Sequence, residues 1–373
     1  MKIVILMGSL TMGGAERVAT TLASYLSKHD VDTYLISFDE NESSYFIEPS
    51  VHFINNKDCK KKGKFKGIKQ RINFLFHTLD KIKPDLIFTM FCITNVYALL
   101  YKFFHDRKIK VVSSERCNPK AKDRKGIKEI LNRFSSAKCD GFIFQTEKAQ
   151  KCYPKKVQKK SIVIHNAVSN PMLNEVDTST IMTKKIISSM GRLEEQKAQD
   201  IMIKAFEPIA QSYPEYKLII YGEGSKREEL ERLIKELNLQ KNVFLPGNDE
   251  KAILKVAQSQ IFILTSRFEG MPNALIEAMA LGIPSISTDC DMGPSELINS
   301  GENGYLVAVD DVNDITNKLE LLINDNKLRN FISENSRKIN ETHSIDKIYR
   351  KYLEYFKKIV GGKNEKENIE RAS

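Results

Sequence analysis

The chain has 373 residues, of which 41% are hydrophobic and 28% charged, with a formal net charge of +10. This length is sufficient for two α/β domains, and the hydrophobic content excludes an intrinsically disordered protein. No apolar run reaches the roughly 18 residues that a membrane-spanning helix needs, and six cysteines without C-x-x-C pairs disfavour a disulfide framework or a zinc site.

Strand-like and helix-like segments alternate along the first half, which predicts a parallel sheet built from βαβ units. Seven short apolar runs predict its strands: KIVILM (2–7), VDTYLIS (31–37), VHFI (51–54), PDLIFTM (84–90), IKVVSS (109–114), GFIFQ (141–145) and SIVIHN (161–166). Helical periodicity occupies residues 15–28, 68–82 and 127–138. Residues 169–183 contain Pro171 and lack apolar periodicity, so the domain boundary is expected there.

The second half repeats the alternation. Its predicted strands are KKIISSM (184–190), YKLIIYG (216–222), NVFLPG (242–247), QIFILTS (260–266), IPSISTD (283–289) and GYLVAV (304–309). A final amphipathic helix is expected over residues 345–359. The predicted domains are therefore residues 1–168 and 169–344, followed by this helix and a frayed, charged tail at 361–373.

The segment FEGMPNALIE at residues 268–277 is the most informative part of the chain, because Glu269 and Glu277 bracket a predicted helix start. Gly270 permits a tight turn, and Pro272 suits the first helical position. Helix-start amides favour an anion, and carboxylates accept hydrogen bonds from hydroxyls. The segment is compatible with a ligand that carries phosphate and sugar, and equally with an ordinary strand-loop-helix whose glutamates are solvated.

This segment resembles the E-x7-E motif of retaining glycosyltransferases of family 4. The resemblance implies the α/β GT-B fold, with two facing Rossmann-like domains and a deep interdomain cleft. Further segments follow the order of that family: MGGAERV (12–18), SERCNP (114–119), IHNAV (164–168), GRLEEQK (191–197), YGEG (221–224) and GPSELI (293–298). The similarity extends to about residue 358. The resemblance implies that the first domain binds the acceptor, that the second binds the nucleotide sugar, and that the last helix, over residues 345–360, packs back on the first domain.

The resemblance implies a donor site in which Glu277 holds ribose hydroxyls, Glu269 holds the donor sugar, and Arg192 and Lys197 neutralise the diphosphate. Without it, Arg192 and Lys197 would be read as ordinary solvated surface residues. The residues expected to bind the nucleotide sugar are Gly13, Gly14, Gly191, Arg192, Lys197, Gly222, Gly247, Glu269, Gly270, Met271, Pro272, Asn273, Ala274 and Glu277. Gly13 and Gly14 open a predicted helix, where their amides can approach a phosphate or an acceptor, although a plain glycine turn has the same pattern.

Glu115 and Arg116 end a strand of the first domain and are expected to project into the cleft as further catalytic residues. Some relatives carry a histidine in this neighbourhood, so the acceptor-side role stays open. Glu115 as a base, either residue orienting the acceptor hydroxyl, and a structural ion pair are all compatible with the sequence. His165 and Asn166 close the domain and are interpreted as structural.

No cofactor and no metal are expected. Asp289 and Asp291 form a D-x-D pattern, but it follows a late strand of the second domain, and Arg192 and Lys197 already supply positive charge. Gly293 and Glu296 are expected to contact phosphate and donor sugar instead. YGEGS at 221–225 lacks the third glycine of a dinucleotide fingerprint, which disfavours a nicotinamide cofactor.

The charge is uneven: residues 1–170 carry a net +15 and residues 171–373 a net −5. Basic clusters at 57–71, 102–110, 120–128 and 151–160 are interleaved with apolar residues, namely Phe65, Ile68, Phe74, Phe103 and Phe104. This mixture favours an anionic membrane surface, although lysine-rich solvated faces would look similar. The chain has no nucleic-acid-binding motif, so nucleic acid is not expected as a partner.

The family resemblance, together with these features, predicts a metal-independent retaining glycosyltransferase that moves a sugar from a UDP-sugar to a polyprenyl-diphosphate-linked saccharide of a bacterial surface polysaccharide. Retention is implied by the resemblance alone. We expect it in the cytoplasm, peripherally on the inner face of the plasma membrane. A glycosyltransferase with a soluble or protein acceptor, a sugar-nucleotide 2-epimerase of the same fold and a non-catalytic nucleotide-sugar-binding protein are the alternatives.

Overall fold

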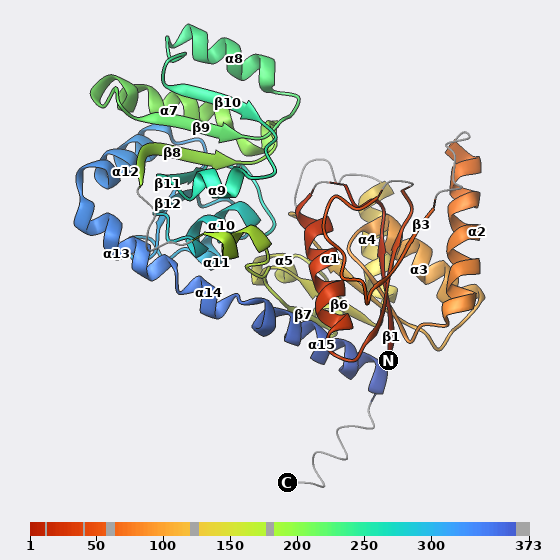
Figure 1. The fold of residues 1–373 in the computed structure, drawn as a ribbon. Helices are drawn as coiled ribbons and strands as arrows, with labels where there is room; N and C mark the ends of the chain where they lie inside the picture. The colour runs from red at the N-terminus through yellow and green to blue at the C-terminus, as the bar shows by residue number, and fades with distance from the viewer. Residues whose placement is uncertain (12, 40–41, 57–63, 120–126, 177–182, 363–373) are drawn as a thin grey trace, which may run out of the picture. The chain divides into compact units, whose positions relative to one another are not determined.

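The computed structural model describes residues 1–11, 13–39, 42–56, 64–119, 127–176 and 183–362. The chain divides into two compact units: residues 1–169 together with the segment from residue 345, and residues 170–344. Each unit contains one parallel β-sheet with helices packed on it (Figure 1). The α/β class predicted from the alternating pattern is therefore confirmed.

The first unit is built on seven parallel strands in the order β3-β2-β1-β4-β5-β6-β7. Their bounds are β1 (Lys2–Met7), β2 (Asp32–Ser37), β3 (His52–Asn55), β4 (Leu86–Thr89), β5 (Lys110–Glu115), β6 (Gly141–Phe144) and β7 (Ser161–Val163). Residues 3–7 of the inner strand β1 are wholly buried. Its sequence is a continuous apolar run because helices cover both faces of the sheet.

Two layers of helices cover this sheet. The helices of the first unit are α1 (Gly14–Ser27), α2 (Lys64–Ile82), α3 (Cys92–Phe104), α4 (Ile127–Lys138), α5 (Glu147–Lys151), α6 (Lys155–Gln158) and α15 (Ile345–Gly361). Helices α1 and α15 share a hydrophobic cluster with Ile3 and Ile5, whereas α2 and α3 share another with Val4 and Leu6. Because neighbouring side chains of a strand point to opposite faces, the two clusters lie on opposite sides of the sheet, as α1 and α2 do in Figure 1.

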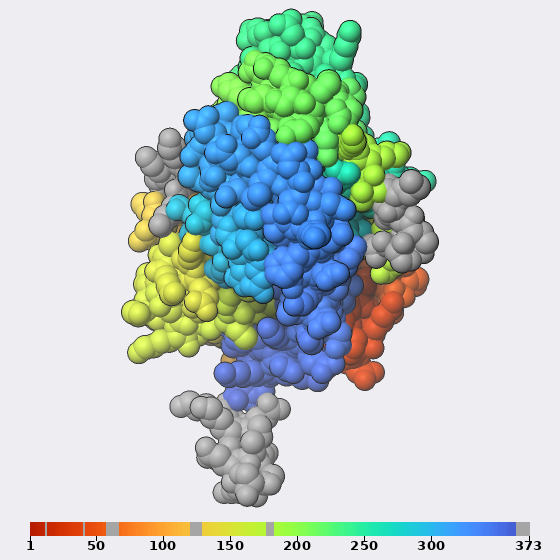
Figure 2. All heavy atoms as spheres, turned by 90° about the vertical axis from the view of Figure 1, so that its left-hand side faces the viewer, coloured from red at the N-terminus to blue at the C-terminus, as the bar shows by residue number. Residues whose placement is uncertain are grey.

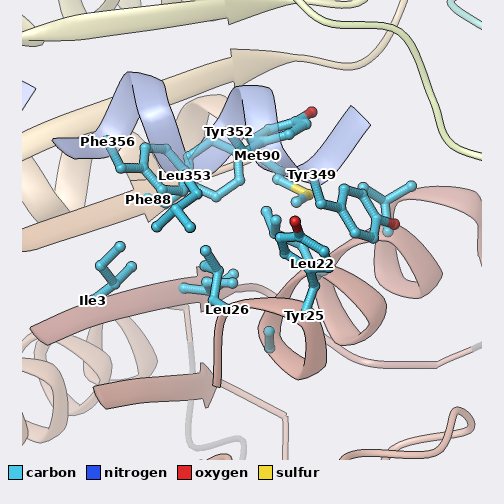
Figure 3. Packing of buried hydrophobic residues seen from close by; sticks show 14 of the residues in the cluster. Ile3, Leu22, Tyr25, Leu26, Phe88, Met90, Tyr349, Tyr352, Leu353 and Phe356 are labelled. Atoms are coloured by element: carbon cyan, nitrogen blue, oxygen red, sulfur yellow. The ribbon is translucent and has the colours of Figure 1, made fainter. Parts of the chain in front are cut away.

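Helix α15 belongs to the first unit although it is the last helix of the chain. Figure 3 shows its aromatic side chains over β4, where the rings of Tyr352 and Phe356 lie 5.9 and 5.2 Å from the ring of Phe88. The Tyr349 hydroxyl lies 2.5 Å from the Thr21 hydroxyl of α1. The apolar stripe of α15 therefore completes the core of a unit whose strands all precede it by more than 180 residues.

The second unit is built on six parallel strands in the order β10-β9-β8-β11-β12-β13. The strands are β8 (Lys184–Met190), β9 (Lys217–Tyr221), β10 (Val243–Gly247), β11 (Ser259–Leu264), β12 (Ser285–Thr288) and β13 (Tyr305–Val307). The helices are α7 (Gln199–Ser212), α8 (Arg227–Glu236), α9 (Ala252–Val256), α10 (Asn273–Ala280), α11 (Pro294–Leu297), α12 (Val312–Asn324), α13 (Asn326–Ser336) and α14 (Ile339–Thr342), with 3-10 turns η2 (Pro171–Glu175) and η3 (Glu195–Lys197). Figure 2 shows the outer surfaces of α7, α12 and α13 in green and blue.

All thirteen predicted strands are present, but some helix and loop predictions need correction. Pro272 is not the first helical residue: its ψ of 105° is extended, and α10 begins at Asn273. The segment predicted as a structureless boundary contains the 3-10 turn η2, and residues 177–182 of it lie outside the described residues. Helix α15 continues to Gly361, and residues 363–373 of the predicted tail lie outside the described ranges. No helix in those ranges has the length and apolar content needed to cross a bilayer.

Candidate active site

The loops after β8 and β11 meet where the strand order of the second sheet reverses. The two strands are neighbours, and the chain proceeds from β8 toward β9 in one direction and from β11 toward β12 in the other. In open parallel α/β sheets, the connections that follow the two strands at such a switch point run in opposite directions. A ligand can therefore bind at the carboxyl ends of these strands. Hydrogen bonds fix the loops to each other: Gln196 Nε2 donates to the Phe268 carbonyl and Arg267 N to the Gln196 carbonyl, both at 2.8 Å.

The two loops place Lys197 against Glu269. Lys197 Nζ lies 2.5 Å from Glu269 Oε1, and the two side chains are only 16% and 8% exposed. Two opposite charges so little exposed to water attract each other more strongly than they would on the surface. Removal of either charge would leave the other one buried without a partner, which is costly. The cation predicted to bind diphosphate and the carboxylate predicted to hold the sugar thus form one unit.

Two hydroxyl side chains that the sequence analysis did not identify support this pair. Ser266 Oγ donates to Glu269 Oε1 at 2.6 Å. Thr265 Oγ1 lies 3.0 Å from the Lys197 carbonyl and 2.9 Å from the carbonyl of Ala198, which has a left-handed backbone with φ of 49°. Thr265 therefore supports a strained turn directly after Lys197.

Glu277 lies inside α10 and is 4% exposed. Asn170 Nδ2 donates to its Oε2 at 3.3 Å, and the Asn170 Oδ1 caps the turn η2 by accepting from Met172 N. A buried carboxylate without hydrogen bonds costs free energy, and the bond from Asn170 offsets part of the cost of burying Glu277. The structure thus brings both glutamates of the motif into the interior of the second unit.

The turn between the two glutamates is closely packed. Gly293 has a φ of +91°, and a Cβ at this position would lie 2.4 Å from the Gly270 carbonyl, so only glycine fits. Helix α10 has no acidic residue in its first turn and no side-chain hydrogen bond from the cap residue Pro272. Its N-terminus is therefore electrostatically suited to a negative group. Met271 is buried, and Asn273 and Ala274 are half-buried beside it.

The glycines predicted to line the nucleotide side contact one another. Gly222 N donates to the Gly247 carbonyl at 2.8 Å, and a Cβ on Gly222 would lie 2.1 Å from the Gly191 carbonyl. A Cβ on Gly191 would meet Lys197 Cε at 3.3 Å. These glycines allow the ends of three strands to approach one another closely beside Lys197. This packing by itself requires glycine at Gly222 and explains why small residues are present there. Arg192, on the loop after β8, is exposed.

In the first unit, Gly13 has an intramolecular partner. Its N–H donates to the Tyr45 hydroxyl at 3.0 Å, and that hydroxyl donates back to the Gly13 carbonyl at 3.0 Å. The Gly13 amide predicted to approach a phosphate or acceptor is therefore engaged by Tyr45, and it would have to exchange this partner for a ligand. Gly14, which begins α1, is exposed.

Glu115 and Arg116 are both buried and hydrogen-bonded within the first unit. Glu115 Oε2 accepts from the Tyr153 hydroxyl at 2.6 Å. Arg116 Nη1 donates to Asn166 Oδ1 at 2.9 Å and Nη2 to the Tyr352 hydroxyl at 2.8 Å. Arg116 thereby connects the end of β5 to α15, an anchoring role that none of the sequence-based alternatives included.

Comparison with known proteins agrees with this geometry. The family model described as "Glycosyltransferase Family 4" matches residues 12–170, and the model "Glycosyl transferases group 1" matches residues 174–339. A Campylobacter jejuni protein, N-acetylgalactosamine-N,N'-diacetylbacillosaminyl-diphospho-undecaprenol 4-alpha-N-acetylgalactosaminyltransferase, is 31% identical over 373 residues, covering 95% of this chain and 99% of the relative. The chain belongs to glycosyltransferase family 4.

Solved structures support the fold of this glycosyltransferase. Anabaena HepE in complex with UDP and glucose matches with a TM-score of 0.78 and 18% identity, covering 95% of this chain and 99% of that one. A TarM variant from S. aureus, in complex with fondaparinux, alpha-GlcNAc-glycerol and UDP, matches with a TM-score of 0.77 and 16% identity, covering 96% and 100%. The two parallel-sheet units are the two Rossmann-like domains of the GT-B class.

The D-x-D pattern of this glycosyltransferase does not form a closed carboxylate cluster. Asp289 and Asp291 are exposed, and Cys290 between them is buried. Burial, and next the negative charge of Glu269, raises the pKa of the Cys290 thiol to about 12. Within the described residues, no group of three or more His, Cys, Asp or Glu side chains is placed to hold a metal ion.

One of the missed site residues had a visible signal. Ser266 stands only three residues before Glu269, so the hydrogen bond between their side chains is a local one. Asn170 and Tyr45 had no such signal, because their partners Glu277 and Gly13 lie 107 and 32 residues away in the chain.

Proposed function

We propose that this glycosyltransferase transfers a sugar from a UDP-sugar, with retention of anomeric configuration and without a metal ion, to a polyprenyl-diphosphate-linked saccharide in bacterial surface polysaccharide synthesis. Residues 170–344 bind the donor, and the first unit binds the acceptor. The enzyme works on the cytoplasmic face of the plasma membrane, which it reaches as a peripheral protein.

The observation that carries the proposal is the largely buried Lys197–Glu269 pair at the switch point of the second sheet, shortly before the N-terminus of α10. An ammonium has three N–H donors, and one of them meets Glu269. The others, with the exposed Arg192 and the α10 amides, suit the diphosphate oxygens. Glu269 is then beside the phosphate and accepts from the donor sugar, while Glu277 accepts from the ribose hydroxyls.

The proposed chemistry uses this charge arrangement, and its stereochemistry is the one that the family resemblance implies. As the bond between the anomeric carbon and the diphosphate oxygen breaks, negative charge grows on the diphosphate, and Lys197 and Arg192 stabilise it. The acceptor oxygen forms its bond on the same face of the sugar, and the acceptor proton passes to the departing diphosphate. Glu269, held by Lys197 and Ser266, orients the sugar throughout and forms no covalent intermediate.

The choice of donor and acceptor rests on the names of similar proteins. The HepE and TarM structures contain UDP, and one HepE structure contains UDP-glucose. The Campylobacter relative is named for an acceptor linked to diphospho-undecaprenol, and a second relative from that organism, 27% identical, is named for a PP-undecaprenol acceptor. A further relative, AmsD of Erwinia amylovora, is named for amylovoran biosynthesis.

The test is a panel of sugar nucleotides, measured for binding by calorimetry and for transfer to synthetic polyprenyl-diphosphate saccharides. We expect UDP to bind, one UDP-sugar to be used, and the product to have the donor's anomeric configuration by NMR. Activity should persist in EDTA and in Asp289→Asn/Asp291→Asn. Inversion, a metal requirement, or epimerised UDP-sugar in the absence of any acceptor would each contradict the proposal.

A further inference from the structure

Helix α4 has its polarity reversed relative to an ordinary surface helix. It buries Ser135 and Ser136, which are 1% and 0% exposed, and presents Ile130 and Phe134, which are 67% and 62% exposed, to the outside. Ile130 and Phe134 are four residues apart and therefore share one stripe of the helix, and Leu131 lies beside them. The hydrophobic effect places apolar side chains in contact with other apolar groups, so this stripe is expected to have a partner outside the unit.

The neighbouring helix α3 also presents apolar side chains to the outside. The two helices pack against each other, and the Cys139 thiol directly after α4 donates to Asn95 Oδ1 of α3. On α3, Phe103 and Phe104 are 63% and 68% exposed, and Ile93 at the start of the helix is 52% exposed. Of the thirteen large hydrophobic residues that are exposed in the described ranges, seven lie on α2, α3 and α4. They are Ile68, Ile93, Phe103, Phe104, Ile130, Leu131 and Phe134.

The same helices are strongly basic. Helices α2, α3 and α4 together contain nine Lys or Arg residues and two acidic residues. The cations stand next to the exposed rings: Lys138 Nζ lies 5.7 Å from the Phe134 ring centre, and the Arg107 guanidinium lies 5.7 Å from the Phe103 ring centre. Apolar side chains surrounded by cations are the composition that binds anionic lipid headgroups while inserting into the acyl boundary.

We propose that the outer face of α2, α3 and α4, here called the basic-apolar face, is the surface by which this glycosyltransferase binds an anionic lipid bilayer. Ile130, Phe134, Phe103 and Phe104 enter the headgroup region, and the surrounding lysines and arginines contact lipid phosphates. The inference rests on the proposed lipid-linked acceptor, because it supplies the reason for the enzyme to work at a bilayer. The lysines at positions 57–63 and the basic segment 120–126, which the sequence analysis assigned to membrane binding, lie outside the described residues.

Charge complementarity selects a bilayer over the other partners. A second copy of the chain would bring two strongly basic faces together, which is repulsive. A nucleic acid would satisfy the cations and stack on the phenylalanines, but it would leave the aliphatic Ile93 and Ile130 without apolar contacts. An anionic bilayer satisfies the cations and the aliphatic side chains at once.

The test is flotation of the full-length protein with vesicles of phosphatidylcholine alone or of phosphatidylcholine with phosphatidylglycerol. We expect binding to the mixed vesicles that weakens as salt is raised, and little binding to the neutral ones. The variant Ile130→Ser/Phe134→Ser should lower the partition coefficient by about tenfold or more, because two side chains lose their apolar contact with lipid. Ile130→Leu/Phe134→Leu should retain most of the binding.

Phe331→Ser is the matched control, because Phe331 is 50% exposed on α13, a helix of the second unit that is not part of the basic-apolar face. It should leave vesicle binding unchanged. Equal binding by wild type and Ile130→Ser/Phe134→Ser, or an equal loss in Phe331→Ser, would overturn the proposal. So would a wild-type dimer in light scattering that becomes monomeric in Ile130→Ser/Phe134→Ser.

UDP affinity, measured on each variant, separates this inference from the proposed function. Loss of vesicle binding with unchanged UDP affinity supports the basic-apolar face independently of catalysis. A wild-type protein that binds anionic vesicles but no UDP would refute the donor assignment and leave the lipid-binding face standing. A protein that binds UDP and ignores anionic vesicles at low salt would refute the face and leave the donor site standing.

Discussion

Lys197 and Glu269 form a largely buried ion pair, Nζ to Oε1 at 2.5 Å, although 72 residues separate them in the chain. The pair joins the two loops that meet at the switch point of the second sheet. It keeps a cation and a carboxylate in place before any donor binds, so the orientation of charge is established by the fold rather than by the ligand.

Lys197→Met is expected to lower turnover by about tenfold to a thousandfold, because the developing diphosphate charge loses a stabilising cation. The same change leaves Glu269 buried without its partner and should reduce the free energy of unfolding by roughly 3 kcal/mol. Steady-state kinetics and urea unfolding measure the two effects.

The double variant Lys197→Met/Glu269→Gln separates these two effects. It removes both charges with little change in shape, so most of the lost stability should return. Activity should stay low, because neither the cation nor the carboxylate is present. Recovery of activity together with stability would show that the pair is structural.

Glu277→Ala is expected to weaken UDP binding by about 1.5–3 kcal/mol, since the ribose hydroxyls would lose a charged acceptor. Glu277→Gln, which preserves the size and the contact with Asn170, should weaken binding less. Calorimetric titration with UDP measures both. Unchanged affinity in a Glu277→Ala protein that melts like the wild type would remove the nucleotide role of Glu277.

Gly222→Ala tests the close approach of the strand ends beside Lys197. Its φ is +140° and the new Cβ would lie 2.1 Å from the Gly191 carbonyl, so we expect a loss of at least about 2 kcal/mol of stability. Gly67→Ala is the matched control, because Gly67 lies within α2 and has no atom within 4 Å of the Cβ position. It should be neutral or stabilise by about 0.5–1 kcal/mol. Similar losses in both variants would contradict the packing argument.

The Cys290 thiol is expected to make the fold sensitive to alkali. Burial raises the pKa of this thiol to about 12 in the folded protein, compared with about 8.5 in an unfolded chain. The contribution of the neutral thiol to the free energy of unfolding is therefore complete below pH 8.5 and is lost as the pH rises toward 12. Each pH unit in that window should cost about 1.4 kcal/mol. The free energy of unfolding, measured with urea at pH 8 and pH 10, should fall less between these pH values in Cys290→Ala than in the wild type. In Cys117→Ala, which removes an exposed thiol, it should fall as much as in the wild type.

Much of the fold could be predicted from the sequence, because strand and helix signals are local. Buried parallel strands are continuous apolar runs, and the run at residues 2–7 is β1 with the bounds that its composition predicts. The helices at 127–138 and near 345–359 followed from apolar periodicity in the same way. The donor-binding role of the second unit came from the resemblance of the Glu269–Glu277 segment to a family motif, and it stays a prediction.

The partners of the site residues were decided by the tertiary structure, because they join distant parts of the chain. No local pattern shows that Lys197 meets Glu269, or that Arg116 donates to Tyr352, 236 residues further on. The reversed polarity of α4 is of the same kind. The sequence shows that Ile130 and Phe134 share a stripe, but only the packing of α4 shows that its serines face the protein and its apolar stripe faces outward. Periodicity defines the faces of a helix, and the fold selects which of them is buried.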